Sequence, residues 1–527
     1  MPVASDAPLL ADLTATELGG RLQAGELSSA EVVEACIKRV EATAEINALV
    51  QPRFDEARAE ARECDGRRAS GAPLGPLHGV PISIKDCFAV AGMATTLGIP
   101  GYSKGPDAAD SPLVARLRAA GAIVLGKTNV PQAMLLHECD NPVFGRTTAA
   151  GFADRSPGGS TGGEAALVAA GGSVLGLGSD LGGSIRQPAA ACGVCGFKPS
   201  PGRLTIEGSQ RAISSGMQAI GIQPGPMARS VADLDLAMRV LADPAFGGRR
   251  PGESSAPWRD YRQVDLAKLR VACWADDGVF KPAVGVARAI ADAAQALRAV
   301  GAEVIELPGE GDSAQAMLDM VRVYIGLVSA DAMASVRRLT RGGRVEPQLA
   351  RQMRLARLPR WGRSALQPLL RGLGQRELAE LLAWSGARSA DEYWQLTTDA
   401  DAFRRRFWPD LDRRVGGRVD AVLSPPYGLP ALRHGTALHL LRAASHSFLA
   451  NLLGVPAGVV PVGFVTAEEE QAEVAARKAA GRSLTHHYAR QNAERSTGLP
   501  LAVEVLGRPG EDHVAMAAMA AIEAARA

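Results

Sequence analysis

Two serines and one lysine have the residue types and the sequence context for nucleophilic catalysis. Ser160 lies in the stretch SPGGSTGGE, Ser184 in GSDLGGSIR and Lys85 in GVPISIKD. A serine hydroxyl is a weak nucleophile that needs an adjacent base, and lysine can be that base only when its pKa is lowered. Residues 80, 82 and 84 are apolar and alternate with others, which predicts a half-buried strand that delivers Lys85 to a core-facing position. The three side chains are therefore candidates for a proton relay.

The glycines that precede Ser184 suggest a site for a negatively charged intermediate. Gly182 and Gly183 have no Cβ, so consecutive backbone N–H groups can point at one spot. Such a spot stabilises the oxyanion that forms in acyl transfer. Taken singly, a lysine after a strand is commonly a surface residue, and a glycine-rich turn with a serine is commonly a turn or helix cap. The three elements together favour the catalytic interpretation.

These stretches resemble the amidase signature family of serine hydrolases. The resemblance implies that Ser184 is the nucleophile, that Ser160 relays its proton to Lys85, and that a cis peptide bond precedes Ser160. Thr161 stands where the family usually has a second serine, and its hydroxyl would support the relay. The resemblance also implies an oxyanion hole formed by the backbone N–H groups of Leu181, Gly182, Gly183 and Ser184.

Further stretches extend the resemblance over most of the chain and bring it nearest to the fatty-acid-amide-hydrolase-like branch. They are TNVPQAM, CGVCGFKP, GPMAR, PAGVVPV and TGLP. Met134 matches a position that lines the acyl pocket in that branch, and Asp180 and Arg186 would orient the catalytic loop by pairing. The resemblance implies a soluble bacterial-type amidase that needs no metal or organic cofactor, and it admits a homodimer.

A competing motif, GAIVLGKT at residues 121–128, satisfies the phosphate-binding-loop pattern letter by letter. A phosphate cradle needs a strand, then a flexible loop, then a helix that opens at the lysine. Here the order is reversed, because residues 112–120 predict a helix that ends at Gly121 and residues 122–125 predict a buried strand. We therefore expect no nucleotide at this motif.

The composition fits a large enzyme that acts on a small molecule. The chain has 527 residues, 46% of them hydrophobic, and a formal net charge of +2, which gives no field to recruit nucleic acid. No apolar signal segment precedes Arg21, and no apolar run reaches the roughly 18 residues of a membrane span. Seven scattered cysteines favour a reducing compartment, the cytoplasm. Cys192 and Cys195 have no second pair nearby and are expected to pack in the core.

The segments that must position these residues alternate between strands and helices. Capping boxes that begin at Thr14 and Ser28 predict helices within residues 1–70. In the core, residues 71–230, strand-like and helical runs alternate at 80–84, 122–125, 163–170 and 173–177. We predict an α/β fold with a mixed, mainly parallel twisted sheet that helices cover on both faces.

Residues beyond this core repeat the pattern and are then interrupted. Residues 268–308 predict strand, helix and strand, and the C-terminal part, 416–527, adds strands at 418–424 and 455–462. We interpret residues 1–527 as one domain with a helical insertion at 310–415. The insertion is rich in arginine and leucine, and Pro359 and Pro368 are expected to cut it into short helices.

The basic amphipathic part of this insertion, residues 349–373, allows three interpretations. Such a stretch can cap an apolar pocket, lie on a membrane surface or coat the core with arginine. We predict a cap over the substrate entrance.

The sequence as a whole predicts a hydrolase that cleaves the C–N bond of amides through an acyl-enzyme. The same machinery would also cleave carbamates (urethanes), anilides and esters with bulky apolar or aromatic groups. One alternative is a glutaminase subunit of an amidotransferase, against which the apolar insertion argues. Another is an inactive binding relative, against which the intact Lys85, Ser160 and Ser184 argue.

Overall fold

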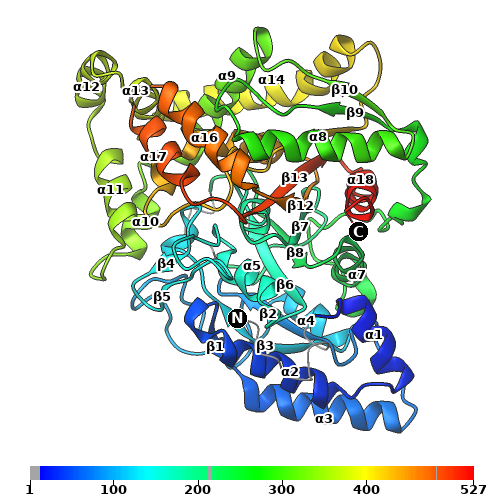
Figure 1. Ribbon diagram of the computed structural model, residues 1–527. Helices are drawn as coiled ribbons and strands as arrows, with labels where there is room; N and C mark the ends of the chain where they lie inside the picture. Colours follow the sequence, from blue (N-terminus) through cyan, green and yellow to red (C-terminus); the bar gives the residue numbers. More distant parts are fainter. Residues whose placement is uncertain (1–11, 211–215, 482, 527) are drawn as a thin grey trace.

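The computed structural model describes residues 12–210, 216–481 and 483–526 (Figure 1). Eleven of the strands in these ranges form one sheet, in the order β1-β3-β2-β6-β8-β7-β12-β13-β11-β9-β10, and β4 and β5 form a separate hairpin. The strands are β1 (Leu49–Pro52), β2 (Pro81–Lys85), β3 (Ile123–Thr128), β4 (Asp140–Asn141), β5 (Gly145–Arg146), β6 (Leu175–Asp180), β7 (Cys195–Lys198), β8 (Gln223–Ala228), β9 (Arg270–Cys273), β10 (Glu303–Glu306), β11 (Ala421–Ser424), β12 (Ala457–Phe464) and β13 (Pro500–Gly507).

The sheet is mixed, as predicted, and its parallel pairs form two blocks. Strands β3, β2 and β6 pair in parallel, and so do β11, β9 and β10. The predicted parallel pairing describes these blocks, whereas the strands between them and the edge strand β1 pair antiparallel. Strand β2 has a parallel neighbour on each side, so its C-terminal residue reaches the same sheet edge as the end of β6.

Helices cover both faces of the sheet (Figure 1). They are α1 (Ala15–Ala24), α2 (Ser29–Ala42), α3 (Phe54–Ala69), α4 (Pro112–Ala119), α5 (Gly162–Ala169), α6 (Arg186–Cys192), α7 (Val231–Leu241), α8 (Val284–Ala299), α9 (Asp312–Val328), α10 (Ala334–Leu339), α11 (Pro347–Ala356), α12 (Arg360–Gly372), α13 (Arg376–Trp384), α14 (Ala390–Arg414), α15 (Ser445–Leu453), α16 (Ala467–Ala479), α17 (Leu484–Ala493) and α18 (Asp512–Ala524).

The alternation of side chains along β12 shows how one sheet supports two cores. Val459 packs with residues of α5 and α6 on one face, and its neighbour Val460 belongs to the core formed with α8 and α18 on the other. Successive side chains of a strand point to opposite faces, and both are fully buried here. Strands that are buried on both faces read as continuous apolar runs.

Helix starts follow the sequence signals. Both capping boxes form: the side chains of Thr14 and Ser28 accept from the backbone three residues on, and the glutamates there accept from the cap N–H groups. Pro359 is the N-cap of α12, but Pro368 lies inside that helix and does not end it, contrary to the prediction. Pro368 and Ser364 are exposed, so water can reach the carbonyl group that the proline leaves without its helical donor.

The GAIVLGKT stretch has the reversed order that we expected. It follows α4, and its last six residues are the buried strand β3. Lys127 is fully buried and pairs with Asp86 at 3.3 Å. The lysine is therefore part of the sheet core, where its partner is a carboxylate and not a phosphate.

Candidate active site

Lys85 is the last residue of β2, and its side chain is fully buried. Because β2 lies between β3 and β6 and under α5, the amine reaches a position closed off from water. Burial disfavours the charged form and lowers the pKa of Lys85, although Asp180 and Glu164 act in the opposite direction. The fold thus favours a neutral amine, the form that can accept a proton.

The amine of Lys85 lies among hydroxyl groups. Its Nζ is 2.8 Å from Oγ of Ser160, 2.9 Å from Oγ1 of Thr161 and 3.0 Å from Oγ of Ser179. The Thr161 hydroxyl also donates to the carbonyl oxygen of Ser179 at 3.2 Å. The structure therefore brings Lys85, Ser160 and Thr161 together, and it adds Ser179 at the end of β6.

The two serine stretches are joined through their backbones. The peptide bond between Gly159 and Ser160 is cis. The N–H of Thr161 donates to the carbonyl oxygen of Ser184 at 3.1 Å, and the N–H of Gly159 donates to Oε1 of Gln187 at 3.0 Å. Ser160 and Ser184 line the same cavity, in which Ser184 is partly exposed and Ser160 is buried.

Asp180 organises the loop that leads to Ser184. Its carboxylate accepts from the N–H groups of Gly183 at 2.9 Å and Ile185 at 3.0 Å. It also forms a fully buried pair with Arg186, whose guanidinium reaches Glu504 as well. These cationic and N–H donors hold the pKa of Asp180 well below its usual range despite burial, and the pKa of Arg186 is raised. The predicted pairing of Asp180 with Arg186 is thus present.

Two aromatic side chains hold the carbonyl groups of this loop. The hydroxyl of Tyr324, on α9, donates to the carbonyl oxygen of Leu181 at 3.1 Å. Nε2 of His137 lies 2.9 Å from the carbonyl oxygen of Gly182. In a trans peptide unit the N–H points away from the C=O, so fixing the Leu181 carbonyl also fixes the direction of the next N–H group. A Cβ at position 182 would lie 2.3 Å from the Tyr324 hydroxyl, which accounts for glycine there.

The N–H groups of the predicted oxyanion hole divide into two sets. That of Gly183 is occupied, because it donates to Asp180. Within the described ranges, those of Leu181, Gly182 and Ser184 have no protein acceptor. The structure therefore corrects the predicted set of four donors: three are free to serve a substrate, and Gly183 serves the loop.

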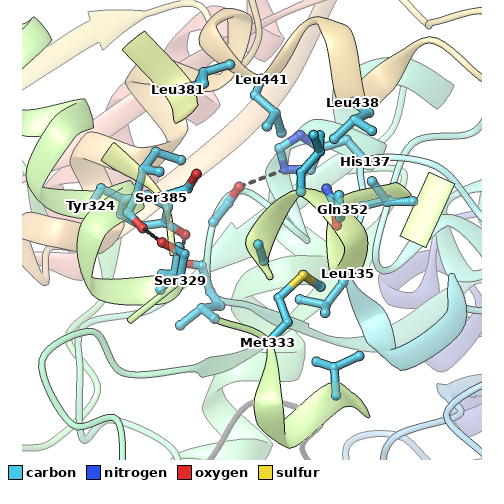
Figure 2. Close-up of a pocket in the computed structure, with 18 of the residues that line it drawn as sticks. Leu135, His137, Tyr324, Ser329, Met333, Gln352, Leu381, Ser385, Leu438 and Leu441 are labelled. Atoms are coloured by element: carbon cyan, nitrogen blue, oxygen red, sulfur yellow. Dashed lines mark hydrogen bonds between the residues drawn. The ribbon is translucent and has the colours of Figure 1, made fainter. Parts of the chain in front are cut away.

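A cavity of about 320 Å³ opens at Ser184 and has mostly apolar walls (Figure 2). Met134, Leu135 and Leu136 come from the segment before His137, and Phe448 comes from α15. The helical insertion supplies a further set: Ile325, Val328, Met333, Val336, Leu355, Ala356, Leu378, Leu381 and Leu382. The predicted contribution of residues 349–373 to the pocket is therefore confirmed for Leu355, and α9 and α13 provide more of the wall.

Met134 lies in a backbone segment with an unusual conformation. Ala133 and Met134 have φ values of 60° and 57°, which L-residues rarely adopt and which are found most often at functional sites. The side chain of Gln132 accepts from the N–H of Glu346 at 2.8 Å and donates to the carbonyl oxygen of Arg344 at 2.9 Å. The pocket wall before His137 is thereby tied to the start of α11.

Sequence reasoning missed His137, Tyr324, Ser179 and Phe448. Ser179 was visible beside Asp180 in a recognised stretch, but a serine among glycines carries no sign of contact with a lysine 94 residues earlier. Tyr324 and Phe448 lie on distant helices and stack at 4.3 Å. No spacing in the sequence relates them to Ser184.

Two searches of the described residues bear on cofactors and membranes. No group of three or more His, Cys, Asp or Glu side chains there has the arrangement of a metal site. None of the helices found in those ranges is long and apolar enough to cross a membrane. Cys192 and Cys195 are free thiols that lie at the end of α6 and the start of β7.

The chain was compared with known families and proteins. The family model described as Amidase matches residues 31–515. Fatty-acid amide hydrolase 1 of Sus scrofa is 33% identical over 523 residues, which cover 98% of this chain and 86% of the relative. A glutamyl-tRNA(Gln) amidotransferase subunit of Synechococcus sp. (strain CC9605) is 33% identical over 471 residues, covering 86% and 91%.

Solved structures give the same result. A fatty acid amide hydrolase aligns with a TM-score of 0.79 and 25% identity, covering 99% of this chain and 86% of that one. A bacterial aryl acylamidase of the amidase signature family aligns with a TM-score of 0.69 and 25% identity, covering 97% and 96%. The chain therefore belongs to the amidase family, as an amidase signature enzyme that hydrolyses amides.

Proposed function

We propose that the chain hydrolyses amides through a Ser184–Ser160–Lys85 relay. The observation that carries the proposal is the 2.8 Å contact between Nζ of a buried Lys85 and Oγ of Ser160 in the cavity that Ser184 lines. Neutral Lys85 takes the proton of Ser160, and Ser160 takes that of Ser184 as its Oγ attacks the carbonyl carbon. Thr161 and Ser179 hold the amine, and Asp180 with Arg186 holds the loop.

The free N–H groups of Leu181, Gly182 and Ser184 are the proposed oxyanion donors. They stabilise the negative charge that develops on the carbonyl oxygen, and they need no reorganisation because the loop is already fixed. The relay then returns a proton to the leaving nitrogen, the C–N bond breaks and the amine departs. Water hydrolyses the acyl-enzyme by the same route in reverse.

The proposed substrates carry a bulky apolar or aromatic group, and they include anilides, aryl carbamates (urethanes) and esters as well as linear amides. The apolar cavity wall supports this choice, since burial of such groups is its main source of binding free energy. The same wall argues against free glutamine and therefore against the glutaminase alternative. We further propose one domain spanning the described sheet and, because all seven cysteines are free thiols, a reducing compartment such as the cytoplasm.

A substrate panel tests this function. Purified protein is assayed with p-nitroanilides, primary fatty amides, aryl carbamates and glutamine, with Ser184→Ala as the background. We expect turnover of the apolar anilides and carbamates that is absent from Ser184→Ala. Fast hydrolysis of glutamine with none of the apolar substrates would replace this proposal by the glutaminase function.

A further inference from the structure

His137 is the one imidazole in the described cavity wall that is within hydrogen-bond distance of the loop before Ser184. Its Nε2 lies 2.9 Å from the carbonyl oxygen of Gly182, as the dashed line at the His137 ring marks in Figure 2. A carbonyl oxygen accepts and never donates, so Nε2 must carry a hydrogen. This contact fixes the orientation of the ring against the loop.

The other ring nitrogen has no partner. Nδ1 of His137 is buried, and no donor or acceptor of the described residues lies within hydrogen-bond distance of it. The neighbouring rings offer no donor: Tyr427 meets the imidazole edge-on at 5.7 Å and gives its hydroxyl to Leu440, and Phe448 lies at 6.2 Å. Tyr324, the nearby phenol, donates its hydroxyl to Leu181.

The protonation state of the ring decides what Nδ1 can do. Burial lowers the pKa of His137, so the imidazole is neutral near pH 7. A neutral imidazole has one N–H, which the Gly182 carbonyl places on Nε2, and Nδ1 therefore carries a lone pair. A buried acceptor without a donor is costly, and the cost is recovered when a ligand supplies the donor.

We propose that Nδ1 of His137 accepts a hydrogen bond from the N–H adjacent to the scissile carbonyl, so that the site selects N–H-bearing amides and carbamates over esters. Gly182 is two residues before Ser184, and its own N–H is a proposed oxyanion donor, so the ring stands beside the position of the carbonyl group. The inference rests on the proposed hydrolysis at Ser184 and adds a specificity contact to it.

A matched substrate pair isolates this contact. An anilide and the phenyl ester of the same acyl chain differ in the N–H, and their intrinsic reactivities cancel when enzyme variants are compared. For His137→Leu, which removes both ring nitrogens, we expect the ratio of kcat/KM for anilide to that for ester to fall about tenfold relative to the unmodified protein. Loss of the hydrogen bond to Gly182 lowers both rates and leaves the ratio unaffected.

Two further variants separate the functions of the ring. His137→Asn places an amide oxygen near the position of Nδ1, so it should recover most of the anilide preference that the leucine variant loses. Tyr324→Phe removes the hydroxyl that holds Leu181 and leaves Nδ1 untouched, so it should lower kcat for both substrates by the same factor.

The outcomes distinguish this inference from the function beneath it. An unchanged anilide-to-ester ratio in His137→Leu, with wild-type turnover of both substrates, would overturn the role of Nδ1 while hydrolysis at Ser184 stands. An equal fall of the ratio in Tyr324→Phe would also overturn it, because the effect would then belong to the loop. Absence of Ser184-dependent turnover of either substrate would refute the proposed function itself.

Discussion

At the residue scale, the site is built around a lysine held neutral without a cationic neighbour. A lysine pKa can be lowered by burial or by a nearby positive charge, and here burial does so: Lys85 is completely enclosed, and its contacts are hydroxyl groups and a carbonyl oxygen. The two carboxyl groups that act on it, Asp180 and Glu164, would raise its pKa. Asp180 is already neutralised by Arg186, and burial raises the pKa of Glu164 to about 8. Desolvation therefore outweighs both.

The lowered pKa of Lys85 predicts how activity depends on pH. Only the neutral amine accepts a proton, so kcat/KM should rise with pH and level off above the lowered pKa, below the ordinary lysine value of 10.5. Lys85→Ala should remove this rise and most of the activity. A pH profile of kcat/KM from pH 5 to 10 measures it, and an unchanged rise in Lys85→Ala would assign it to another group.

Glu164 is the matched control for that experiment, because its pKa of about 8 places its titration in the same range. Its carboxyl group accepts from Ser83 at 2.5 Å and from Thr128 at 2.8 Å. Glu164→Gln keeps the size and hydrogen-bonding capacity of the side chain but cannot titrate. The rise of kcat/KM with pH should persist in this variant.

The relay also predicts the effects of the two serine substitutions. Ser184→Ala should abolish turnover, and a fluorophosphonate probe should label Ser184 alone. Ser160→Ala should be nearly as damaging, because removing any member of a relay that acts as a unit costs about as much as removing the whole. Peptide mapping of the labelled protein checks the assignment; a label on Ser160 would exchange the two roles.

At the element scale, α9 closes the active-site loop from above. Its Tyr324 contacts the loop through the Leu181 carbonyl and also sets the limit on side-chain size at position 182. Asn451 on α15 donates to Asp180 at 3.0 Å, so a second helix from the C-terminal half holds the same loop. The geometry of the loop thus depends on segments that are more than 140 residues away in the chain.

This dependence predicts a stability effect at Gly182. A Cβ there would lie 2.3 Å from the Tyr324 hydroxyl, and the next-nearest atoms are at 3.4 Å. Gly182→Ala should therefore lower the Tm, at a cost of about 1–3 kcal/mol typical of overpacking. Adding Tyr324→Phe removes the clashing atom and should recover most of the loss. Thermal unfolding of the single and double variants checks this.

The control for this prediction is a glycine in open space. Gly20 lies inside α1, and a Cβ built on it meets no atom within 4 Å. Gly20→Ala should raise stability by about 0.5–1 kcal/mol, since alanine loses less backbone entropy in a helix. Equal effects at both positions would contradict the clash with Tyr324.

The outcome at these elements shows what sequence patterns can and cannot predict. The relay residues Lys85 and Ser160 were predictable because a strand-end lysine and glycine-framed serines leave local signals. The strand ends at β2, β3 and β6 were found to within a few residues for the same reason. His137 and Tyr324 were not predictable, because their roles arise only when distant helices pack against the Ser184 loop. Likewise, the antiparallel middle of the sheet depends on long-range pairing that periodicity does not encode.

At the scale of the whole molecule, the helical insertion and the sheet edge together form one apolar cavity above the nucleophile. Arg351 on α11 contacts His439 at 3.1 Å, and that contact joins the insertion to the C-terminal half on the far side of the cavity. Burial and the neighbouring Arg351 lower the pKa of His439 to about 4, so this histidine is neutral near pH 7. The cavity is therefore enclosed by segments from both halves of the chain.

Because the walls are largely hydrocarbon, the molecule as a whole predicts a dependence on acyl length. Each methylene buried in the cavity contributes about 0.8 kcal/mol, nearly fourfold in kcat/KM where the contact is made in the transition state. A homologous series of acyl p-nitroanilides should gain efficiency with each added carbon until the cavity of about 320 Å³ is filled, and then level off. Leu381→Ser, at the wall that α13 provides, should reduce the gain per carbon for long chains and leave short chains little affected. A flat or falling trend with acyl length in the unmodified protein would show that the apolar wall does not hold the acyl group.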